Sequence, residues 1–265
     1  MTESSPEALL AAGNPQAALE ALQARVRERS ADPKLRVFLF QLLCVLGQWQ
    51  RALNQLEVCG ELDAATLPMV NTYREALKCE AVFAGKTTPM IFGRPQPWIA
   101  SLVEALQADA RGDAGLGAQL RADALGAAPA TAGSLDGTAF EWIADADSRL
   151  GPVLEVVING RYGWAPFSEL TQVTIEAPAD LRDMVWAPAQ LSLLNGGQTV
   201  ALVPARYPGT AGAADPALQL SRKTEWLEIG SDQFRGLGQR LLTTNTVELG
   251  LLEARTIVLH AAVAA

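Results

Sequence analysis

Histidine, the side chain that most often moves protons in enzymes, occurs once in this sequence, as His260. It stands close to the C-terminal end, where the rigid, partly enclosed setting of a general base is rare. The patterns G-x-x-x-x-G-K-S/T, G-x-S-x-G and H-E-x-x-H are absent. Gly236 and Gly238 form a G-x-G without a third glycine, which predicts a turn. We therefore expect no catalytic residue, no cofactor and no metal site.

Cysteine is also scarce, with Cys44, Cys59 and Cys79 as the three examples. Their spacing matches neither a zinc motif nor a redox motif. Each stands in or beside an apolar helical stretch, so we expect small, buried core residues.

Long hydrophobic runs are missing, and none reaches the ~18–20 residues of a membrane span. The opening MTESSPEALLAAG carries acids and does not read as a signal peptide. Positive charge is in short supply too: 21 Lys and Arg face 29 Asp and Glu, a net charge of −8. We expect a soluble, cytoplasmic protein that binds neither nucleic acid nor an anionic membrane.

An internal repeat is the most informative feature that is present. Gly13 and Gly47 are 34 residues apart, in AAGNPQAALEAL and VLGQWQRALNQL. That offset places leucine on leucine three times and alanine on alanine once. A period of about 34 residues is typical of tetratricopeptide repeats, which are antiparallel helix pairs that stack into a solenoid with a concave binding face.

Helix signals support this interpretation. Leu35–Leu46 has apolar residues at helical spacing, with Asp32 as a predicted N-cap, Pro33 at the first turn and Gly47 at the end. Two further turns are predicted at Gly85-Lys86 and Gly112-Asp113, after the helices Leu67–Ala84 and Pro97–Arg111. We predict a tetratricopeptide-like domain over 1–126; a plain helical bundle is the alternative.

A change of composition follows. Gly126–Asp136 (GAAPATAGSLD) predicts a linker, over 127–137, between that domain and a mostly antiparallel, β-rich domain over 138–265, so the fold class is α+β. Pro208–Ala217 is expected to be a mobile surface loop. For Leu237–Leu242 the sequence does not decide between a short helix and an extended strand. The predicted strands are Val153–Ile158 and Arg161–Phe167 around an Asn159-Gly160 hairpin turn, Val173–Ile175, Trp186–Leu194 and Thr199–Tyr207 around Asn195-Gly196-Gly197, and Glu253–Leu259.

One acidic cluster could carry chemistry. Glu141, Asp145 and Asp147 are close enough in sequence to bind a hard cation or share a proton. The structural alternative, which we favour, is a polar network in which Arg149 neutralises the carboxylates. An enzyme site around Glu141, Asp145, Asp147 and Arg161 stays open as the second functional hypothesis.

Three blocks of this sequence resemble the ImpE/TagJ family: Phe140–Phe167, Pro178–Gly197 and Ala201–Gly209. The resemblance extends over nearly the whole chain. Gly163 departs from the family's tyrosine-like position, and we expect looser packing there. Membership implies an accessory component of bacterial type VI secretion, similar to adaptors that bind the N-terminal helix of the small sheath subunit TssB. It also implies an indirect connection to ClpV, the ATPase that disassembles the spent sheath.

The partner helix could dock on either half of the chain. On the repeat half, the first helix of the second hairpin would expose Val37, Gln41 and Cys44 on the concave face. On the second half, Tyr162 and Trp164 share a strand face and could form an aromatic platform. We favour the repeat half, because helical repeats present a groove.

Overall fold

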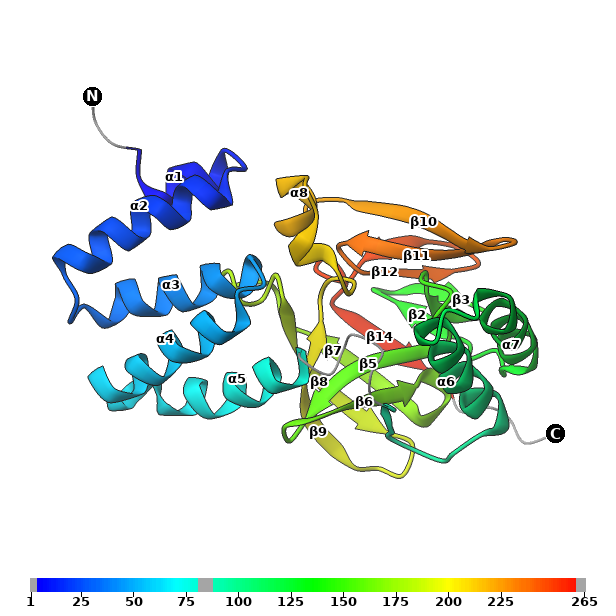
Figure 1. The fold of residues 1–265 in the computed structure, drawn as a ribbon. Helices are drawn as coiled ribbons and strands as arrows, with labels where there is room; N and C mark the ends of the chain where they lie inside the picture. The colour runs from blue at the N-terminus through cyan, green and yellow to red at the C-terminus, as the bar shows by residue number, and fades with distance from the viewer. Residues whose placement is uncertain (1–3, 81–87, 261–265) are drawn as a thin grey trace.

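The structure is a computed structural model that describes residues 4–80 and 88–260 (Figure 1). Five helices come first and a large β-sheet follows, with most of the remaining chain packed around that sheet. The predicted α+β class, with helices before a mostly antiparallel β-rich region, is confirmed. Within the described residues, no helix is long and apolar enough to cross a membrane.

The helical part, which we define as α1 to α5, consists of short helices with side-chain caps. Ser5, Asn14 and Asp32 each accept a hydrogen bond from a backbone N–H in the first turn, and a proline follows each of them. The elements are α1 (Pro6–Ala11), α2 (Pro15–Glu28), α3 (Pro33–Val45), α4 (Trp49–Leu62), the 3-10 turn η1 (Ala64–Thr66) and α5 (Leu67–Glu80).

The two glycines of the repeat close equivalent turns. Gly13 has φ of 79° and Gly47 has φ of 64°, left-handed values that glycine adopts without strain. The residue after each glycine donates its N–H to a leucine carbonyl, Asn14 to Leu9 at 2.8 Å and Gln48 to Leu43 at 2.9 Å. Both bonds follow the 34-residue offset, so the sequence similarity corresponds to the same local structure. The predicted turn at Gly85-Lys86 lies outside the described residues.

Within residues 4–80 and 88–260, the main sheet has nine strands in the order β1-β6-β5-β9-β8-β7-β14-β2-β3, and every neighbouring pair is antiparallel except β1 and β6. The hairpin turn at Asn159-Gly160 is confirmed, with positive φ at both residues. The strands of the main sheet are β1 (Met90–Ile91), β2 (Gly133–Leu135), β3 (Thr138–Phe140), β5 (Val153–Ile158), β6 (Arg161–Pro166), β7 (Leu170–Ile175), β8 (Trp186–Leu193), β9 (Gln198–Pro204) and β14 (Thr256–Leu259).

Two smaller sheets complete the β structure of the part of the chain that the structure describes. One joins β13, β12 and β4, and the other is the hairpin of β10 and β11. The region left open at Leu237–Leu242 is strand on both sides of a short break, and Gly236 and Gly238 lie in β11 rather than in the predicted turn. The bounds are β4 (Ile143–Asp145), β10 (Thr224–Gly230), β11 (Gln233–Gly238), β12 (Leu241–Thr244) and β13 (Glu248–Gly250).

The linker predicted at 127–137 is wrong. Gly133–Leu135 is β2, which pairs with β14 and β3 inside the main sheet. The helices before it, α6 (Pro97–Ala110) and α7 (Ala114–Ala127), form a hairpin around Gly112, as predicted. Trp98, Ile99 and Leu102 of α6 share a core with the strand residues Val153 and Trp164. The boundary predicted at residue 126 therefore does not separate helices from sheet, because α6 and α7 pack on the sheet.

The segment between β9 and β10 is more ordered than the surface loop predicted at Pro208–Ala217. It contains the 3-10 turn η3 (Thr210–Gly212) and the start of α8 (Pro216–Gln219), and Thr210 is buried. A further 3-10 turn, η2 (Phe167–Glu169), connects β6 to β7.

Both faces of the main sheet bury apolar side chains. One face packs on the three-stranded sheet around Val156, Val203 and Leu242. The other face packs on the helical part, where the ring of Trp186 lies 5.9 Å from Trp49 and 5.8 Å from Tyr73. Figure 1 shows α5 beside β8 and β9. The helical part and the sheet therefore share one continuous core.

Candidate functional site

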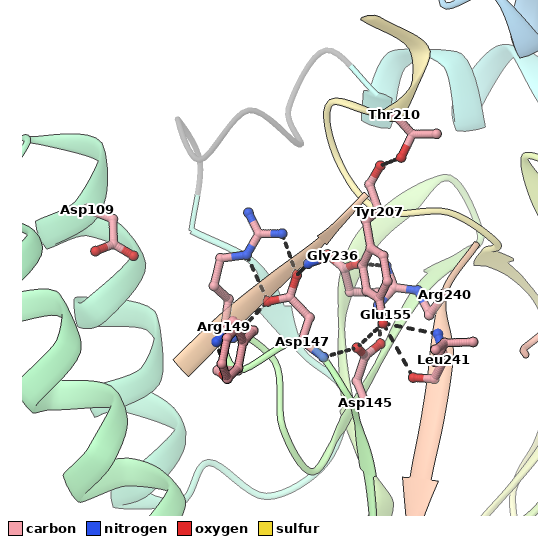
Figure 2. A network of polar contacts seen from close by, with 12 residues as sticks. Asp109, Asp145, Asp147, Arg149, Glu155, Tyr207, Thr210, Gly236, Arg240 and Leu241 are labelled. Atoms are coloured by element: carbon pink, nitrogen blue, oxygen red, sulfur yellow. Dashed lines mark hydrogen bonds and ion pairs between the residues drawn. The ribbon is translucent and has the colours of Figure 1, made fainter. Parts of the chain in front are cut away.

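The acidic cluster singled out in the sequence is the centre of a buried charge network (Figure 2). The guanidinium of Arg240 forms ion pairs with Asp145 and Glu155, and its Nε donates to the Pro204 carbonyl at 2.8 Å. The hydroxyl of Tyr207 donates to Asp145 at 3.0 Å. Every nitrogen of the Arg240 guanidinium thus has an acceptor inside the protein.

A second ion pair extends the network toward α6. Arg149 donates to both carboxylate oxygens of Asp147, at 2.9 and 2.6 Å. The backbone N–H groups of Asp147 and Gly236 donate to Asp145 at 2.8 Å and to Asp147 at 3.0 Å. Side-chain and backbone bonds together connect β4 to β11 and β12.

Burial decides the electrostatics of this network. Three carboxylates, on Asp145, Asp147 and Glu155, face two guanidiniums, on Arg149 and Arg240, so the group carries excess negative charge. Burial raises the pKa of Asp145 to about 6, although the Arg240 guanidinium opposes that rise. Burial likewise raises the pKa of Tyr207, and the Asp145 carboxylate beside it adds to the effect.

The network has the geometry of an internal support rather than of a reaction centre. Asp145 is 4% exposed, Glu155 3% and Arg240 0%, so a substrate does not reach them in this conformation. Glu141, grouped with them in the enzyme hypothesis, is exposed, and so is Arg161 at the hairpin turn. In the described part of the chain, no three His, Cys, Asp or Glu side chains are placed to hold a metal ion. His260 is exposed beyond β14.

The aromatic pair predicted as a docking platform belongs to the core. Trp164 is 0% exposed, and its indole N–H donates to the Tyr162 hydroxyl at 3.1 Å. That hydroxyl in turn donates to Glu155. Tyr162 and Trp164 do share one strand face, but α6 covers that face, so the expected platform is wrong.

Nor does Gly163, between them, loosen the packing. A Cβ there would lie 2.2 Å from the Met90 carbonyl oxygen, because β1 runs directly against it. Glycine is required at this position, and the close approach of β1 makes the packing tighter.

The three predicted docking residues on α3 differ in how far they are exposed. Cys44 is fully buried and Gln41 is 7% exposed, so the expectation that both are displayed on a concave face is wrong. The reason is that the chain's own loop between β7 and β8 covers this side, where Asp180 accepts a hydrogen bond from Gln41. Val37 is half-buried and lines an apolar hollow of about 330 Å³ with Pro33 and Phe38. Lys34, Gln41, Asp63 and Thr66 complete this hollow.

The cysteines are buried, as predicted. Burial raises the pKa of the Cys59 thiol to about 11, which keeps it in the unreactive thiol form at neutral pH.

A larger hollow, which the sequence did not indicate, lies between α5 and the main sheet. Its volume is about 480 Å³. Asn71, Thr72 and Glu75 of α5 form one wall, and the side chains of β5, β8 and β9 form the floor. In the sequence, Val200 was the available signal, because it is an apolar residue at an alternate position of a predicted strand. Period-two alternation alone, however, does not separate an exposed apolar strand residue from a covered one.

The profile of the ImpE protein family matches residues 137–258. The type VI secretion system accessory component TagJ of Pseudomonas aeruginosa is 53% identical over 255 residues, which are 95% of this chain and 89% of that protein. The chain belongs to the ImpE/TagJ family.

A crystal structure shows how widely the fold of this ImpE/TagJ chain extends. A protein of Vibrio parahaemolyticus is 23% identical and superposes with a TM-score of 0.87 over 96% of this chain and 97% of that one. The arrangement of helical part and sheet is therefore a fold shared with a distant sequence.

Proposed function

We propose that this chain is a non-enzymatic accessory component of a bacterial type VI secretion system. In this role it binds the N-terminal helix of the small sheath subunit TssB in the cytoplasm. Its 53% identity to TagJ, itself a type VI secretion accessory component, carries the proposal. The connection to ClpV-driven sheath recycling is indirect and runs through the bound TssB.

The hollow at Val37 is the docking position that we propose for the helix. Val37 and Phe38 supply an apolar floor, while Lys34 and Asp63 give the rim one charge of each sign. An apolar centre with a polar rim is the pattern of interfaces that accept an amphipathic helix. Gln41 also lines the hollow, whereas Cys44 is fully buried in the core beneath α3's surface.

Binding of a synthetic TssB N-terminal peptide, measured by calorimetry, tests this assignment. Replacing an anchor at the centre of an interface removes ~2 kcal/mol or more, roughly thirtyfold in affinity. Val37→Asp should therefore weaken binding at least thirtyfold, with an unchanged circular dichroism spectrum. Val200→Asp, a matched change at a valine that is 69% exposed, should leave binding intact.

Two outcomes contradict the proposal at different levels. If the wild-type protein does not bind the peptide, the adaptor function itself is wrong. If Val200→Asp abolishes binding while Val37→Asp does not, the function stands but the docking position is wrong.

A further inference from the structure

The main sheet has a face that the helical part leaves partly uncovered. On this face, Gln190 is paired with Val200 and Ser192 with Gln198 across β8 and β9. The neighbouring strand β7 adds Gln172 and Thr174 in register. We call these residues the open sheet face: Gln172, Thr174, Gln190, Ser192, Gln198 and Val200.

The open sheet face carries no charge. All six side chains are uncharged, in a chain with 21 basic and 29 acidic residues. The centres of protein interfaces are depleted in charged side chains, whereas charged residues are mostly found on the exposed surface of proteins. The composition of this face is therefore typical of a surface that a partner covers.

The hollow beside α5 continues from this face. The two share Gln190 and Val200, and the hollow adds the apolar side chains of Val157, Pro188 and Leu202. Across the strand pair, Pro188 is opposite Leu202, one row nearer to the helical part than Gln190 and Val200. An apolar floor thus runs from α5 out to an exposed valine.

A helix already covers the neighbouring part of this sheet face. Helix α5 already packs on the same sheet face through Tyr73, whose ring lies 5.8 Å from Trp186. A second helix beside α5 would cover the next rows of the sheet, as helices do in layered folds, at the usual 8–10 Å between axes. Val200, 69% exposed, is the side chain that such a helix would bury most.

The charge at the rim of the groove favours a partner with basic residues on its polar side. Among the described residues, those that line the groove include two acids, Glu75 and Glu176, and neither lysine nor arginine. Glu75 is already paired with Lys78 at 2.6 Å. Glu176 is exposed and forms no ion pair within the described residues. An incoming lysine or arginine would complete that pair.

We propose that the groove between α5 and the open sheet face is a second docking surface, for an amphipathic helix of a partner protein with a basic edge. Its apolar side would lie on Val200, Leu202 and Pro188, and its Lys or Arg residues would face Glu176. Since the hollow at Val37 is a separate depression, this surface would give the molecule two independent contacts.

The test uses a synthetic amphipathic helix built from leucine, lysine and glutamine, labelled for fluorescence anisotropy. A second peptide has glutamate in place of every lysine. We expect the basic peptide to bind and the acidic one not to bind. Val200→Asp should weaken binding of the basic peptide by ~tenfold or more. Glu176→Lys should also weaken binding, and its difference in affinity from wild type should become smaller as salt is added. Val37→Asp and Leu116→Asp, the latter an exposed residue of α7, are the controls that should bind normally.

Three results would overturn the proposal. The first is equal binding of the basic and acidic peptides. The second is equal affinity in wild type, Val200→Asp and Leu116→Asp, which would show attraction to the acidic chain as a whole. The third is a wild-type dimer in light scattering that Val200→Asp converts to a monomer, because a second copy would then cover this face.

Discussion

Arg206 donates a hydrogen bond of 2.7 Å from Nη1 to the backbone carbonyl of Val45. Its Nη2 donates to the Cys44 carbonyl at 2.8 Å. These carbonyls belong to the last turn of α3, where the helix supplies few backbone donors, although the Cys44 carbonyl also accepts the Gly47 N–H at 3.0 Å. One arginine that follows β9 therefore caps a helix of the helical part and joins it to the sheet.

Arg222 repeats this arrangement one repeat earlier. Its Nη2 donates to the Leu10 carbonyl at 2.8 Å and its Nη1 to Ala11 at 3.3 Å. Leu10 and Ala11 precede Cys44 and Val45 by 34 positions. The two helix ends that the repeat places in equivalent positions are thus capped by two arginines from the same short segment.

Loss of the Arg206 cap should weaken the whole molecule. Arg206→Met removes the bonds to the carbonyls of Val45, Gln219 and Cys44. The Cys44 carbonyl keeps the Gly47 N–H, whereas the Val45 carbonyl loses its donor, a loss that costs ~1–3 kcal/mol at a buried site. Arg222→Met is the matched control, because Arg222 is exposed and water can replace its bonds; it should cost under ~1 kcal/mol. Urea unfolding measures both. Equal losses in the two variants would mean that Arg206 is no more important than a surface cap.

The repeat turns offer a second matched pair. Gly47 and Gly112 both end a helix with positive φ, 64° and 84°. A Cβ at Gly47 would lie 2.5 Å from the Ala211 Cβ, whereas a Cβ at Gly112 meets nothing within 4 Å. Gly112→Ala should lose ~1 kcal/mol for the left-handed conformation alone.

Gly47→Ala should lose clearly more than that, since Ala211 and the segment around it must move. Denaturant unfolding of the two variants gives the difference directly. If the losses are the same, the contact between the α3–α4 turn and the 210–212 segment is loose in solution.

Local signals in the sequence predict the parts of this fold that local forces determine. The β5–β6 hairpin was predicted with its turn because β-branched residues flank Asn159-Gly160. The helix end at Gly47 was predicted because a left-handed residue strongly favours glycine. The 34-residue repeat relates Gly13 to Gly47, and a helix–helix turn was predicted at Gly112-Asp113.

Long-range contacts account for what the sequence did not reveal. Gly126–Asp136 has the composition of a linker, but a Cβ at Gly133 would lie 2.0 Å from the Val258 carbonyl oxygen. The residue is small because β14 passes against it, and Val258 of β14 lies 125 positions later in the sequence. Composition does not separate a flexible glycine from one that a neighbouring strand requires.

The polar network was predicted only in part for the same reason. Asp145 and Asp147 are visible as a local cluster, while Arg240, which neutralises Asp145, is 95 residues away. Glu155 offered a signal, since a carboxylate inside the apolar run of β5 must be paired if the strand is buried. That rule indicates that a partner exists without naming it.

The pH dependence of stability should show whether burial or the ion pair with Arg240 has the larger effect on Asp145. Its pKa in the folded protein is about 6, above the ordinary 3.8, because burial disfavours the charged form. The folded state then holds the proton more tightly than the unfolded chain, so this carboxyl favours folding most below pH 3.8. That contribution, up to ~3 kcal/mol, is lost as the pH rises through about 6.

Asp145→Asn removes this titration while it keeps the shape of the side chain. Relative to wild type, the variant should therefore gain stability between pH 4 and pH 7, by up to ~3 kcal/mol in urea unfolding. Asp123→Asn, a change at an exposed residue of α7, should show no such trend. If Asp145→Asn instead loses stability relative to wild type as the pH rises, the ion pair with Arg240 outweighs burial, and the carboxylate stabilises the fold in its charged form.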